Sequence, residues 1–453
     1  MHPRPGKQGG GSRVRIYPAR LRPYRLSYRL AIHGPGRPIR RMVGARAEWM
    51  GGVGPCGCPA AAVRLLHINP LAVSEHEIEG ETPVYHPQLG DPLDALDTPS
   101  MIVNLTLMEE NIARLMERFR GSKVHIRPHL KTVKSPELAR ILLAAGAIGG
   151  CVAKVSEAEV MAQGGIEDLL ITTEIVGKPK LTRLSTLVQQ HPRTKVVVDS
   201  LVGAQELNQA MHEAQQHIDV LIDINVGQNR CGVMPGEEAL RLAHYLRELS
   251  HVHLMGVQGY EGHLQHVHDP EERAQRCRQA MQLLTDTATQ LKEAGFPIEV
   301  VTTGGTGTAE ICASCNGVTE VQPGSFVFMD TDYRNALGPV YANALTILST
   351  VISRPAPTRA VIDAGLKSLS IDSGMPEPRE LPGIKYRPGG DEHGILTWED
   401  GALPANFQLA VGDRIALIPS HIDTTINLHD YYYAYRDGKL EAIWPVAARG
   451  KVQ

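Results

Sequence analysis

The sequence predicts an α/β fold: a (β/α)8 TIM-type barrel followed by a mainly antiparallel β domain. Two patterns support this prediction. From about residue 124, eight short apolar runs rich in β-branched residues alternate with helical segments, as parallel strands do when helices cover them. From about residue 340, the segments are β-rich and punctuated by Gly and Pro, without a long helix between them.

The predicted elements follow one another regularly after residue 95. Residues 98–105 are expected to form a strand and residues 106–120 an amphipathic helix. The barrel strands are predicted to centre on Val124–Arg127, Gly150–Lys154, Asp168–Thr173, Lys195–Asp199, Asp219–Val226, Leu254–Tyr260, Glu299–Thr303 and Glu320–Pro323. Later strands are expected at Leu345–Ile352, Ala360–Ile362 and Arg414–Ile418. We therefore assign residues 106–335 to the barrel, and residues 93–105 with 336–453 to a β-rich domain.

The N-terminal segment differs in composition from the rest of the chain. Residues 1–47 contain eleven Arg, one Lys and no acidic residue, which leaves 34 basic and 49 acidic residues downstream. We expect residues 1–90 to be a disordered extension. It is interpreted as an organelle transit peptide, a nucleic-acid arm or a non-native extension from an upstream start.

The composition also narrows the class of protein. The acidic main body argues against a nucleic-acid partner. No apolar run is long enough to cross a membrane. Seven scattered cysteines do not form a disulfide framework and indicate a reducing compartment. We therefore expect a cytoplasmic protein, or an organellar one if the extension is a targeting signal.

Lys131 ends the first predicted barrel strand. A lysine amine at the carboxyl end of a barrel strand is suited to Schiff-base chemistry with an aldehyde cofactor such as pyridoxal 5'-phosphate. The alternative is a solvated lysine without a role. Such a cofactor would also need a phosphate cradle, a group over its ring and a group at its pyridine edge.

Two glycine-containing loops are candidates for the phosphate cradle. Thr303, Gly304, Gly305 and Thr306 follow the seventh predicted strand and open a helix, and Gly324–Ser325 follows the eighth. Glycines let the backbone approach a phosphate, and the loops after strands 7 and 8 form the usual phosphate site of this barrel. The alternative is a pair of tight barrel turns.

Charged and aromatic residues follow two further strands. Arg230 follows the fifth strand, and Tyr260 ends the sixth, where an aromatic ring can stack on a pyridine ring. His263 and His266 come next and could serve as acid or base near neutral pH. Each of these residues alone is also consistent with an exposed loop.

His421 and Asp423 form a candidate metal pair in the predicted β domain. Positions i and i+2 of a strand face the same side, so the two side chains could hold one divalent cation. The alternative is a hydrogen-bonded pair at a strand end. Cys312 and Cys315 lie on a predicted helix without partners for redox or zinc chemistry, which favours helix packing.

Several motifs together resemble the fold-type III pyridoxal-phosphate enzymes, the alanine-racemase-like barrels, and within them the D-threonine aldolase and D-serine dehydratase branch. The resemblance runs from about Leu93 to the end of the chain. Its motifs are, in order, Arg127-Pro-His-x-Lys131-Thr, Lys154-Val-Ser-Glu-Ala-Glu, Gly304-Gly-Thr-Gly, Gln322-Pro-Gly-Ser-x-Val-Phe-Met-Asp330, Asp363-Ala-Gly-x-Lys367, Asp391-Glu-His-Gly394 and Pro419-x-His421-x-Asp423.

The resemblance implies roles for the candidate residues. Lys131 would be the Schiff-base lysine, Arg230 would lie near the cofactor's phenolic oxygen, and Tyr260 would stack on its ring. The loops at 303–306 and 324–325 would hold the phosphate. Gln322 falls where alanine racemases have an arginine against the pyridine nitrogen. His266 would be the base for the substrate β-hydroxyl.

The metal pair and one departure distinguish this chain within the branch. By the resemblance, His421 and Asp423 would bind a divalent cation, with Mn²⁺ favoured over Zn²⁺, Co²⁺ or Mg²⁺. Aldolases of the branch carry this H-x-D form, whereas the dehydratases usually carry H-x-C. The chain has Val133 where the family usually has a histidine.

The resulting expectation is retro-aldol cleavage of D-threonine and related D-β-hydroxy-α-amino acids to glycine and an aldehyde, by a homodimer. The first alternative is a D-serine or D-3-hydroxyaspartate dehydratase, because the same groups serve both reactions. The second is a non-catalytic pyridoxal-phosphate-binding protein built on this barrel.

Overall fold

The structure is a computed structural model that describes residues 87–401 and 409–453. The described residues all belong to one compact unit, Pro83–Gln453. The predicted disordered extension, residues 1–90, falls almost wholly outside the described residues. None of the helices within the described ranges combines the length and the apolar character needed to cross a bilayer.

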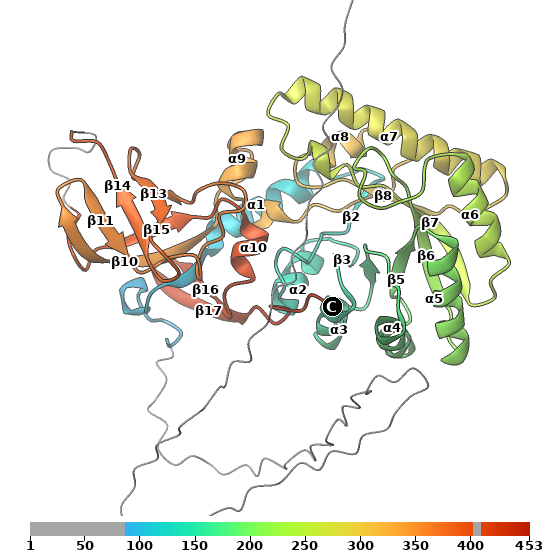
Figure 1. The fold of residues 1–453 in the computed structure, drawn as a ribbon, viewed down its shortest axis with the longest axis horizontal. Coiled ribbons are helices and arrows are strands. Elements are labelled where there is room, and N and C mark those ends of the chain that lie inside the picture. Colours follow the sequence, from blue (N-terminus) through green and yellow to red (C-terminus); the bar gives the residue numbers. More distant parts are fainter. Residues whose placement is uncertain (1–86, 402–408) are drawn as a thin grey trace, which may run out of the picture. The chain divides into compact units, whose positions relative to one another are not determined.

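A parallel sheet of eight strands forms the barrel, as the sequence predicts (Figure 1). The strands are β2 (His125–Ile126), β3 (Gly150–Val152), β4 (Leu169–Ile171), β5 (Lys195–Val198), β6 (Ile218–Asp223), β7 (Val252–Gln258), β8 (Val300–Thr303) and β9 (Glu320–Val321). Their order is β2-β9-β8-β7-β6-β5-β4-β3. The backbone N–H of Cys151 donates to Pro128 and that of Leu130 donates to Cys151, so the chain after β2 pairs with β3 and closes the barrel.

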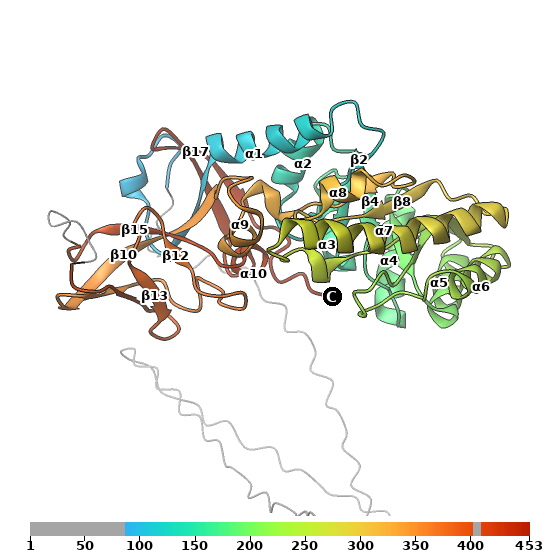
Figure 2. The ribbon, with the colours of Figure 1, turned by 90° about the horizontal axis from the view of Figure 1, so that it is seen from above.

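Helices alternate with these strands and cover the outer face of the barrel (Figure 2). They are α1 (Leu105–Arg118), α2 (Pro136–Ala144), α3 (Val155–Gln163), α4 (Lys178–Gln190), α5 (Leu201–Glu213), α6 (Glu237–Arg247), α7 (Pro270–Glu293) and α8 (Ala309–Ala313). Because the eight strands are parallel, their carboxyl ends all lie at one face, where barrel enzymes build their sites.

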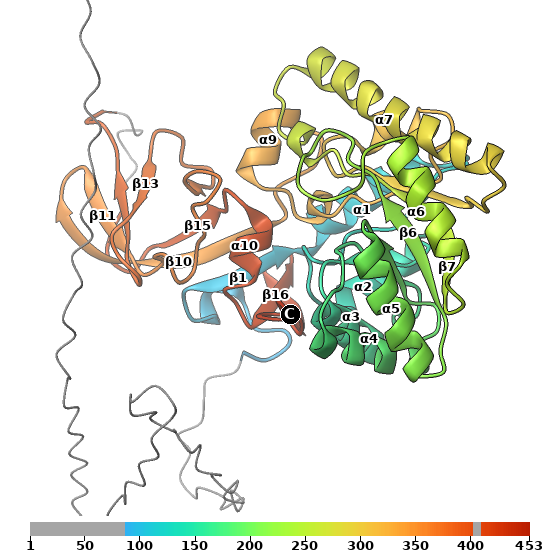
Figure 3. The same cartoon turned by 45° about the vertical axis from the view of Figure 1, so that its right-hand side comes forward.

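A second sheet of nine mainly antiparallel strands is formed by both ends of the described chain (Figure 3). Its strands are β1 (Ser100–Asn104), β10 (Leu345–Ala356), β11 (Arg359–Ile362), β12 (Glu377–Pro378), β13 (Lys385–Pro388), β14 (Gly394–Thr397), β15 (Arg414–Ile418), β16 (Tyr431–Arg436) and β17 (Lys439–Pro445). β1 lies between β10 and β16, antiparallel to the first and parallel to the second. The early strand therefore belongs to the second sheet.

Buried apolar side chains connect the two sheets. One continuous cluster of buried residues extends from the barrel strands and helices into β10, β15 and β16. A separate cluster lies inside the barrel, where β3, β4, β5 and β6 contribute Cys151, Leu170, Val197 and Leu221. Layers of inward-facing side chains of this kind make the barrel a packed core.

Two hydrogen bonds attach the lysine-bearing segment to the C-terminal part of the chain, one to β16 and one to the residues that follow β17. The buried hydroxyl of Tyr432, on β16, donates to the backbone oxygen of Val133 at 2.7 Å. The backbone N–H of Ala448 donates to the oxygen of Lys134 at 2.9 Å. Lys134 has a positive φ of 48°, and its amine pairs with Glu157 at 2.5 Å. The segment after Lys131 is therefore held by β16 and the chain after β17 on one side, and by α3 of the barrel on the other.

Candidate active site

A cavity of about 380 Å³ lies at the carboxyl ends of the barrel strands. Ligand cavities of small molecules are of this size. Apart from Thr303 and His263, every residue that the sequence predicted for the site lines the cavity: Lys131, Arg230, Tyr260, His266, Gly304, Gly305, Thr306, Gln322, Gly324, Ser325, His421 and Asp423. Residues separated by nearly three hundred positions in the chain thus meet in one cavity.

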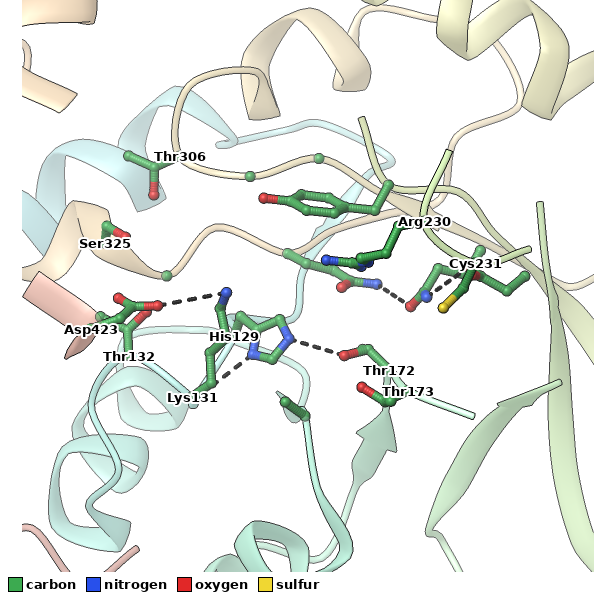
Figure 4. Close-up of a pocket in the computed structure, with 18 of the residues that line it drawn as sticks. His129, Lys131, Thr132, Thr172, Thr173, Arg230, Cys231, Thr306, Ser325 and Asp423 are labelled. Carbon is green, nitrogen blue, oxygen red and sulfur yellow. Dashed lines mark hydrogen bonds and ion pairs between the residues drawn. The ribbon is translucent and has the colours of Figure 1, made fainter. Parts of the chain in front are cut away.

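Lys131 lies in the cavity beside Asp423 (Figure 4). Its Nζ is 3.6 Å from Asp423 Oδ2, and 44% of the lysine side chain is exposed. The carboxylate raises the pKa of Lys131 above its ordinary value, an effect that burial opposes. The carboxylate of Asp423 therefore favours the charged form of the Schiff-base candidate.

His129 forms the other wall near the lysine. Its Nε2 lies 3.0 Å from the hydroxyl of Thr172, as the dashed line in Figure 4 shows. Burial, and then the positive charge of Lys131, hold the pKa of His129 well below its ordinary value. The ring is therefore neutral and offers a flat, uncharged surface to the cavity.

The two glycine loops meet beside the lysine. The backbone N–H of Phe326 donates to Thr306 Oγ1 at 3.1 Å, which ties the loop after β9 to the loop after β8. A Cβ on Gly324 would lie 2.6 Å from Thr132 Oγ1 and 3.0 Å from the oxygen of His129, so only glycine fits. Gly304 has φ of 81°, which also favours glycine. A backbone of this kind leaves room for a phosphate group.

Thr303 points away from the cavity and toward a buried acid. Its hydroxyl donates to Glu261 Oε2 at 2.9 Å. Glu261 is fully buried and also accepts a hydrogen bond from Gln265 Nε2 at 3.0 Å and one from the hydroxyl of Thr308 at 2.5 Å. Thr303 and Glu261 therefore support the phosphate loop from behind.

Arg230 and Tyr260 stand together in the cavity. The guanidinium carbon of Arg230 lies 5.6 Å from the centre of the Tyr260 ring. Burial raises the pKa of the Tyr260 hydroxyl above its ordinary value, so the ring remains a neutral phenol. The pair offers an aromatic face and a cation to a planar, anionic ligand.

Gln322 is the last of three buried polar side chains that are linked by hydrogen bonds. Its Nε2 donates to Gln258 Oε1 at 3.1 Å and to Thr302 Oγ1 at 2.8 Å. Gln258 Nε2 in turn donates to Asp223 Oδ1 at 2.9 Å. The three lining residues Gln322, Gln258 and Asp223 thus form one hydrogen-bonded chain.

His266 lies beside an acid and an aromatic ring. Its Nδ1 is 3.1 Å from Asp332 Oδ2, and its ring centre is 4.3 Å from that of Tyr333. Burial lowers the pKa of His266 below its ordinary value, and the charge of Asp332 opposes this shift. A neutral imidazole with Nδ1 toward a carboxylate has Nε2 available to accept a proton.

The prediction that His421 and Asp423 share one face of a strand is wrong. β15 ends at Ile418, and α10 begins at Ile422, so Asp423 lies in the first turn of a helix and His421 caps it. The chain leaves the sheet through Pro419 and Ser420, and the alternation of a strand no longer applies. Both side chains nevertheless line the same cavity.

The surroundings of His421 and Asp423 suit a metal ion. His421 Nδ1 lies 2.6 Å from Asp372 Oδ2, an arrangement that orients a ligating histidine and leaves Nε2 for the ion. Burial disfavours the Asp372 anion, but hydrogen bonds from Ser370, His421 and Thr424 outweigh this and lower its pKa to about 2. Asp423 Oδ1 is buried without a hydrogen-bond partner among the described residues.

Two more buried atoms of the cavity wall lack partners in the described part of the chain, namely Thr132 Oγ1 and Glu174 Oε1. Buried polar atoms are nearly always hydrogen-bonded, so such atoms indicate a ligand. The glycine loops, the lysine and these atoms fit pyridoxal phosphate, and His421 with Asp423 fits a divalent cation.

Several residues of the site were not assigned a role from the sequence. Asp372 and Asp332 orient the two histidines, Glu261 supports the phosphate loop, and Asp223 with Gln258 supports Gln322. Only Glu261 carried a signal, because it directly follows Tyr260. The partners of the others are separated by 35 or more residues in the chain.

Comparison with known proteins identifies the class. The family model for the alanine racemase N-terminal domain matches residues 103–332, and that for a putative serine dehydratase domain matches residues 344–435. An alanine racemase of Clostridium difficile, 15% identical, has the same fold with a TM-score of 0.60 over 78% of this chain and 99% of its own. The chain therefore belongs to the alanine racemase N-terminal domain family.

Individual enzymes of the family are similar to this chain over most of its length. A D-threonine aldolase from an Arthrobacter species is 42% identical over 80% of this chain and 95% of its own length. A 3-hydroxy-D-aspartate aldolase from Paracoccus denitrificans is 34% identical over 79% and 93%. The solved D-threonine aldolase of Filomicrobium marinum is 41% identical, with a TM-score of 0.77 over 81% and 99% of the two chains. The chain is an enzyme homologous to D-threonine aldolase.

A dehydratase is among the relatives as well. The D-threo-3-hydroxyaspartate dehydratase of a Delftia species is 32% identical over 74% of this chain and 93% of its own. One solved structure of a D-threo-3-hydroxyaspartate dehydratase is a cysteine-to-alanine variant in a metal-free form. The relatives thus include a dehydratase with a metal-free form as well as aldolases.

Proposed function

We propose that this enzyme uses pyridoxal phosphate and a divalent cation to cleave D-threonine and related D-β-hydroxy-α-amino acids into glycine and an aldehyde. The observation that carries the proposal is the meeting of Lys131 with the His421 and Asp423 pair in one cavity, where Lys131 Nζ lies 3.6 Å from Asp423 Oδ2. The likeness to D-threonine aldolase supports the choice of reaction.

Different residues would hold the aldehyde, the phosphate and the ring of the cofactor. Lys131 would bind the aldehyde carbon, and the backbone of Gly304, Gly305 and Thr306 with Gly324–Ser325 would hold the phosphate. Arg230 and Tyr260 would contact the ring and its phenolic oxygen. When bound, pyridoxal phosphate supplies a carbonyl that condenses with amines and a ring that takes up an electron pair.

His266 would carry out the proton transfer. The β-hydroxyl loses its proton to Nε2 of His266 as the bond between Cα and Cβ breaks, and the aldehyde leaves. Asp332, 3.1 Å from Nδ1, keeps the ring in the tautomer that can accept at Nε2. His421 and Asp423 would hold the divalent cation, whose positive charge would lower the pKa of that hydroxyl.

Oxygen and imidazole ligands together are consistent with Mn²⁺, with Zn²⁺, Co²⁺ and Mg²⁺ as the alternatives. We also propose that the enzyme works as a cytoplasmic homodimer. The cytoplasmic location and the homodimer are supported by the sequence analysis.

The second candidate function is the dehydration of D-serine or D-3-hydroxyaspartate. It is favoured by the likeness to the Delftia dehydratase. In that reaction the cavity would serve removal of the α-proton and loss of the β-hydroxyl.

Product analysis separates the candidates. Incubation of the protein with D-threonine, pyridoxal phosphate and Mn²⁺ is expected to yield equal amounts of glycine and acetaldehyde. Formation of 2-oxobutanoate and ammonia instead would make the enzyme a dehydratase. If no D-β-hydroxy amino acid is turned over with any of the four metals, the protein binds the cofactor without catalysis.

A further inference from the structure

The floor of the cavity contains a chain of three buried polar side chains. Asp223 ends β6, Gln258 ends β7, and Gln322 follows β9. Their side chains are 8%, 3% and 7% exposed. The links are 2.9 Å between Gln258 Nε2 and Asp223 Oδ1, and 3.1 Å between Gln322 Nε2 and Gln258 Oε1. The mechanism above does not use this chain.

An ionised Asp223 fixes the direction of every hydrogen bond in the chain. A carboxylate only accepts, so Gln258 must turn its NH₂ group toward Asp223 and its oxygen toward Gln322. Gln322 must then turn its own NH₂ group toward Gln258, and its second hydrogen goes to Thr302 Oγ1 at 2.8 Å. Both donors of Gln322 are used, and only its Oε1 remains for a ligand.

The position of Gln322 relates it to the cofactor ring. This step rests on the proposed function, in which Lys131 binds the aldehyde carbon and the loop at Gly324–Ser325 holds phosphate. The ring nitrogen of pyridoxal phosphate is para to the carbon that bears the aldehyde, so it lies at the end of the ring remote from Lys131. Two amide side chains line the cavity, those of Gln258 and Gln322. Gln258 uses both ends of its amide within the hydrogen-bonded chain, so Gln322, two residues before Gly324, is the one whose oxygen is left to face the ring nitrogen.

We propose that Asp223, acting through Gln258 and Gln322, keeps the ring nitrogen of the bound cofactor protonated. An amide oxygen facing an unprotonated nitrogen would oppose two lone pairs, whereas a protonated nitrogen donates a charge-assisted hydrogen bond to it. Protonation makes the ring a better acceptor of the electron pair released at the α-carbon. Asp223 is a positioning residue in this scheme, because it acts on the ring nitrogen through Gln258 and Gln322.

The negative charge on Asp223 and the positive charge on the ring nitrogen, at the two ends of the hydrogen-bonded chain, stabilise each other. Burial raises the pKa of Asp223 to about 7, Glu174 and Asp199 add to the shift, and the hydrogen bond from Gln258 opposes it. A neutral carboxyl could donate to Gln258 and reverse both amides. A positive ring nitrogen at the other end favours the ionised carboxylate, because polarised hydrogen bonds in a chain strengthen one another.

The test is ¹⁵N NMR of the full-length protein loaded with pyridoxal phosphate labelled at the ring nitrogen, without substrate. We expect the signal of a protonated pyridine at pH 7.5. Asp223→Leu is expected to lower the proton affinity of the ring nitrogen about tenfold, seen as a shift of about one pH unit in its titration. Asp199→Leu removes a neighbouring acid that accepts from the N–H of Gly232 and is outside the hydrogen-bonded chain. Because Asp199 raises the pKa of Asp223, its loss favours the ionised Asp223, and the signal of a protonated pyridine should persist at pH 7.5 in this control.

Each outcome decides the proposal. A neutral nitrogen in the unchanged protein overturns it, while the proposed function stands. An unchanged titration in Asp223→Leu also overturns it. If that variant fails to fold, Gln258→Leu interrupts the chain one link further on and is read in the same way. Failure of the unchanged protein to bind the labelled cofactor removes the proposed function, and the inference falls with it.

Discussion

At the scale of single residues, the contact between Lys131 and Asp423 joins the two halves of the chemistry. The carboxylate that would bind the metal is also the group that raises the pKa of the lysine amine. An amine must be neutral to attack an aldehyde, so the two functions of the site are coupled.

Replacing Asp423 by Asn tests this coupling. Without the carboxylate, the pKa of Lys131 falls and more of the amine is neutral at pH 7.5. We expect metal-free Asp423→Asn to take up pyridoxal phosphate faster than the unchanged metal-free protein, followed by the yellow absorbance of the bound cofactor. Turnover of D-threonine should no longer respond to Mn²⁺. Asp372→Asn leaves Asp423 beside Lys131 and is the control for the rate of cofactor uptake. Slower uptake in Asp423→Asn than in the unchanged protein would contradict the account.

The pKa of His266 gives a prediction on pH. Burial lowers this pKa below the ordinary value of 6.5, so the neutral, proton-accepting ring persists below that pH. Activity should therefore decline only as pH falls through the lowered pKa. Asp332→Asn removes the charge that opposes the shift, so the acidic limb of kcat/KM against pH should move to still lower pH. A limb that moves upward would exclude His266 as the base.

At the scale of elements, Asp330 connects the starts of two short helices. It caps α9 (Thr331–Leu337), where Oδ1 accepts the N–H of Tyr333 at 2.9 Å, and its Oδ2 accepts the N–H of Ile422 in α10 at 3.0 Å. Its side chain is 1% exposed. One carboxylate thus fixes the position of Asp332, the partner of His266, relative to the metal pair.

We expect Asp330→Ala to lower the free energy of unfolding by about 1–3 kcal/mol, because a helix cap and a buried acceptor are lost together. Chemical denaturation measures this. Asp330→Asn keeps one acceptor and should lose less. Equal stability of the Ala variant and the unchanged protein would refute the capping role.

Most elements could be predicted because their signals are local. The β-branched runs at Lys195–Val198 and Val300–Thr303 lie within the predicted strands, since a strand buried on both faces is apolar throughout. The error at His421 and Asp423 has a local cause as well. The chain changes from strand to helix within three residues, and alternation cannot be extended across that change.

At the scale of the whole molecule, the second sheet supports the segment that follows Lys131. Tyr432 donates to the backbone oxygen of Val133, two residues after Lys131. The relation between Lys131 and the metal pair therefore depends on the contact between barrel and β domain.

Tyr432→Phe should cost about 1 kcal/mol of stability and increase the rate at which pyridoxal phosphate is lost on dilution. The control is Tyr386→Phe, which removes a comparable buried bond to the oxygen of Ala364 elsewhere in the second sheet. Thermal unfolding should report similar losses for both variants. Equal cofactor retention in the two variants would show that the hydrogen bond from Tyr432 to Val133 has no effect on the site.

The sequence also predicted most of the cavity wall, since motifs at strand ends must meet at one face of a barrel. It could not predict Asp372, Asp332 or Asp223, because an isolated aspartate has no pattern and its histidine or amide partner lies far along the chain. Thr303 was included because it precedes the glycines, but its hydroxyl turns to Glu261.

The central claim is that Lys131 and the His421 and Asp423 pair act on one substrate. The most direct measurement follows glycine formation from D-threonine by the cofactor-loaded protein before and after EDTA, and again after Mn²⁺ is restored. We expect glycine formation to stop with EDTA and return with Mn²⁺, while the yellow absorbance of the cofactor on Lys131 persists throughout. Glycine formation that continues at full rate in EDTA would contradict the account.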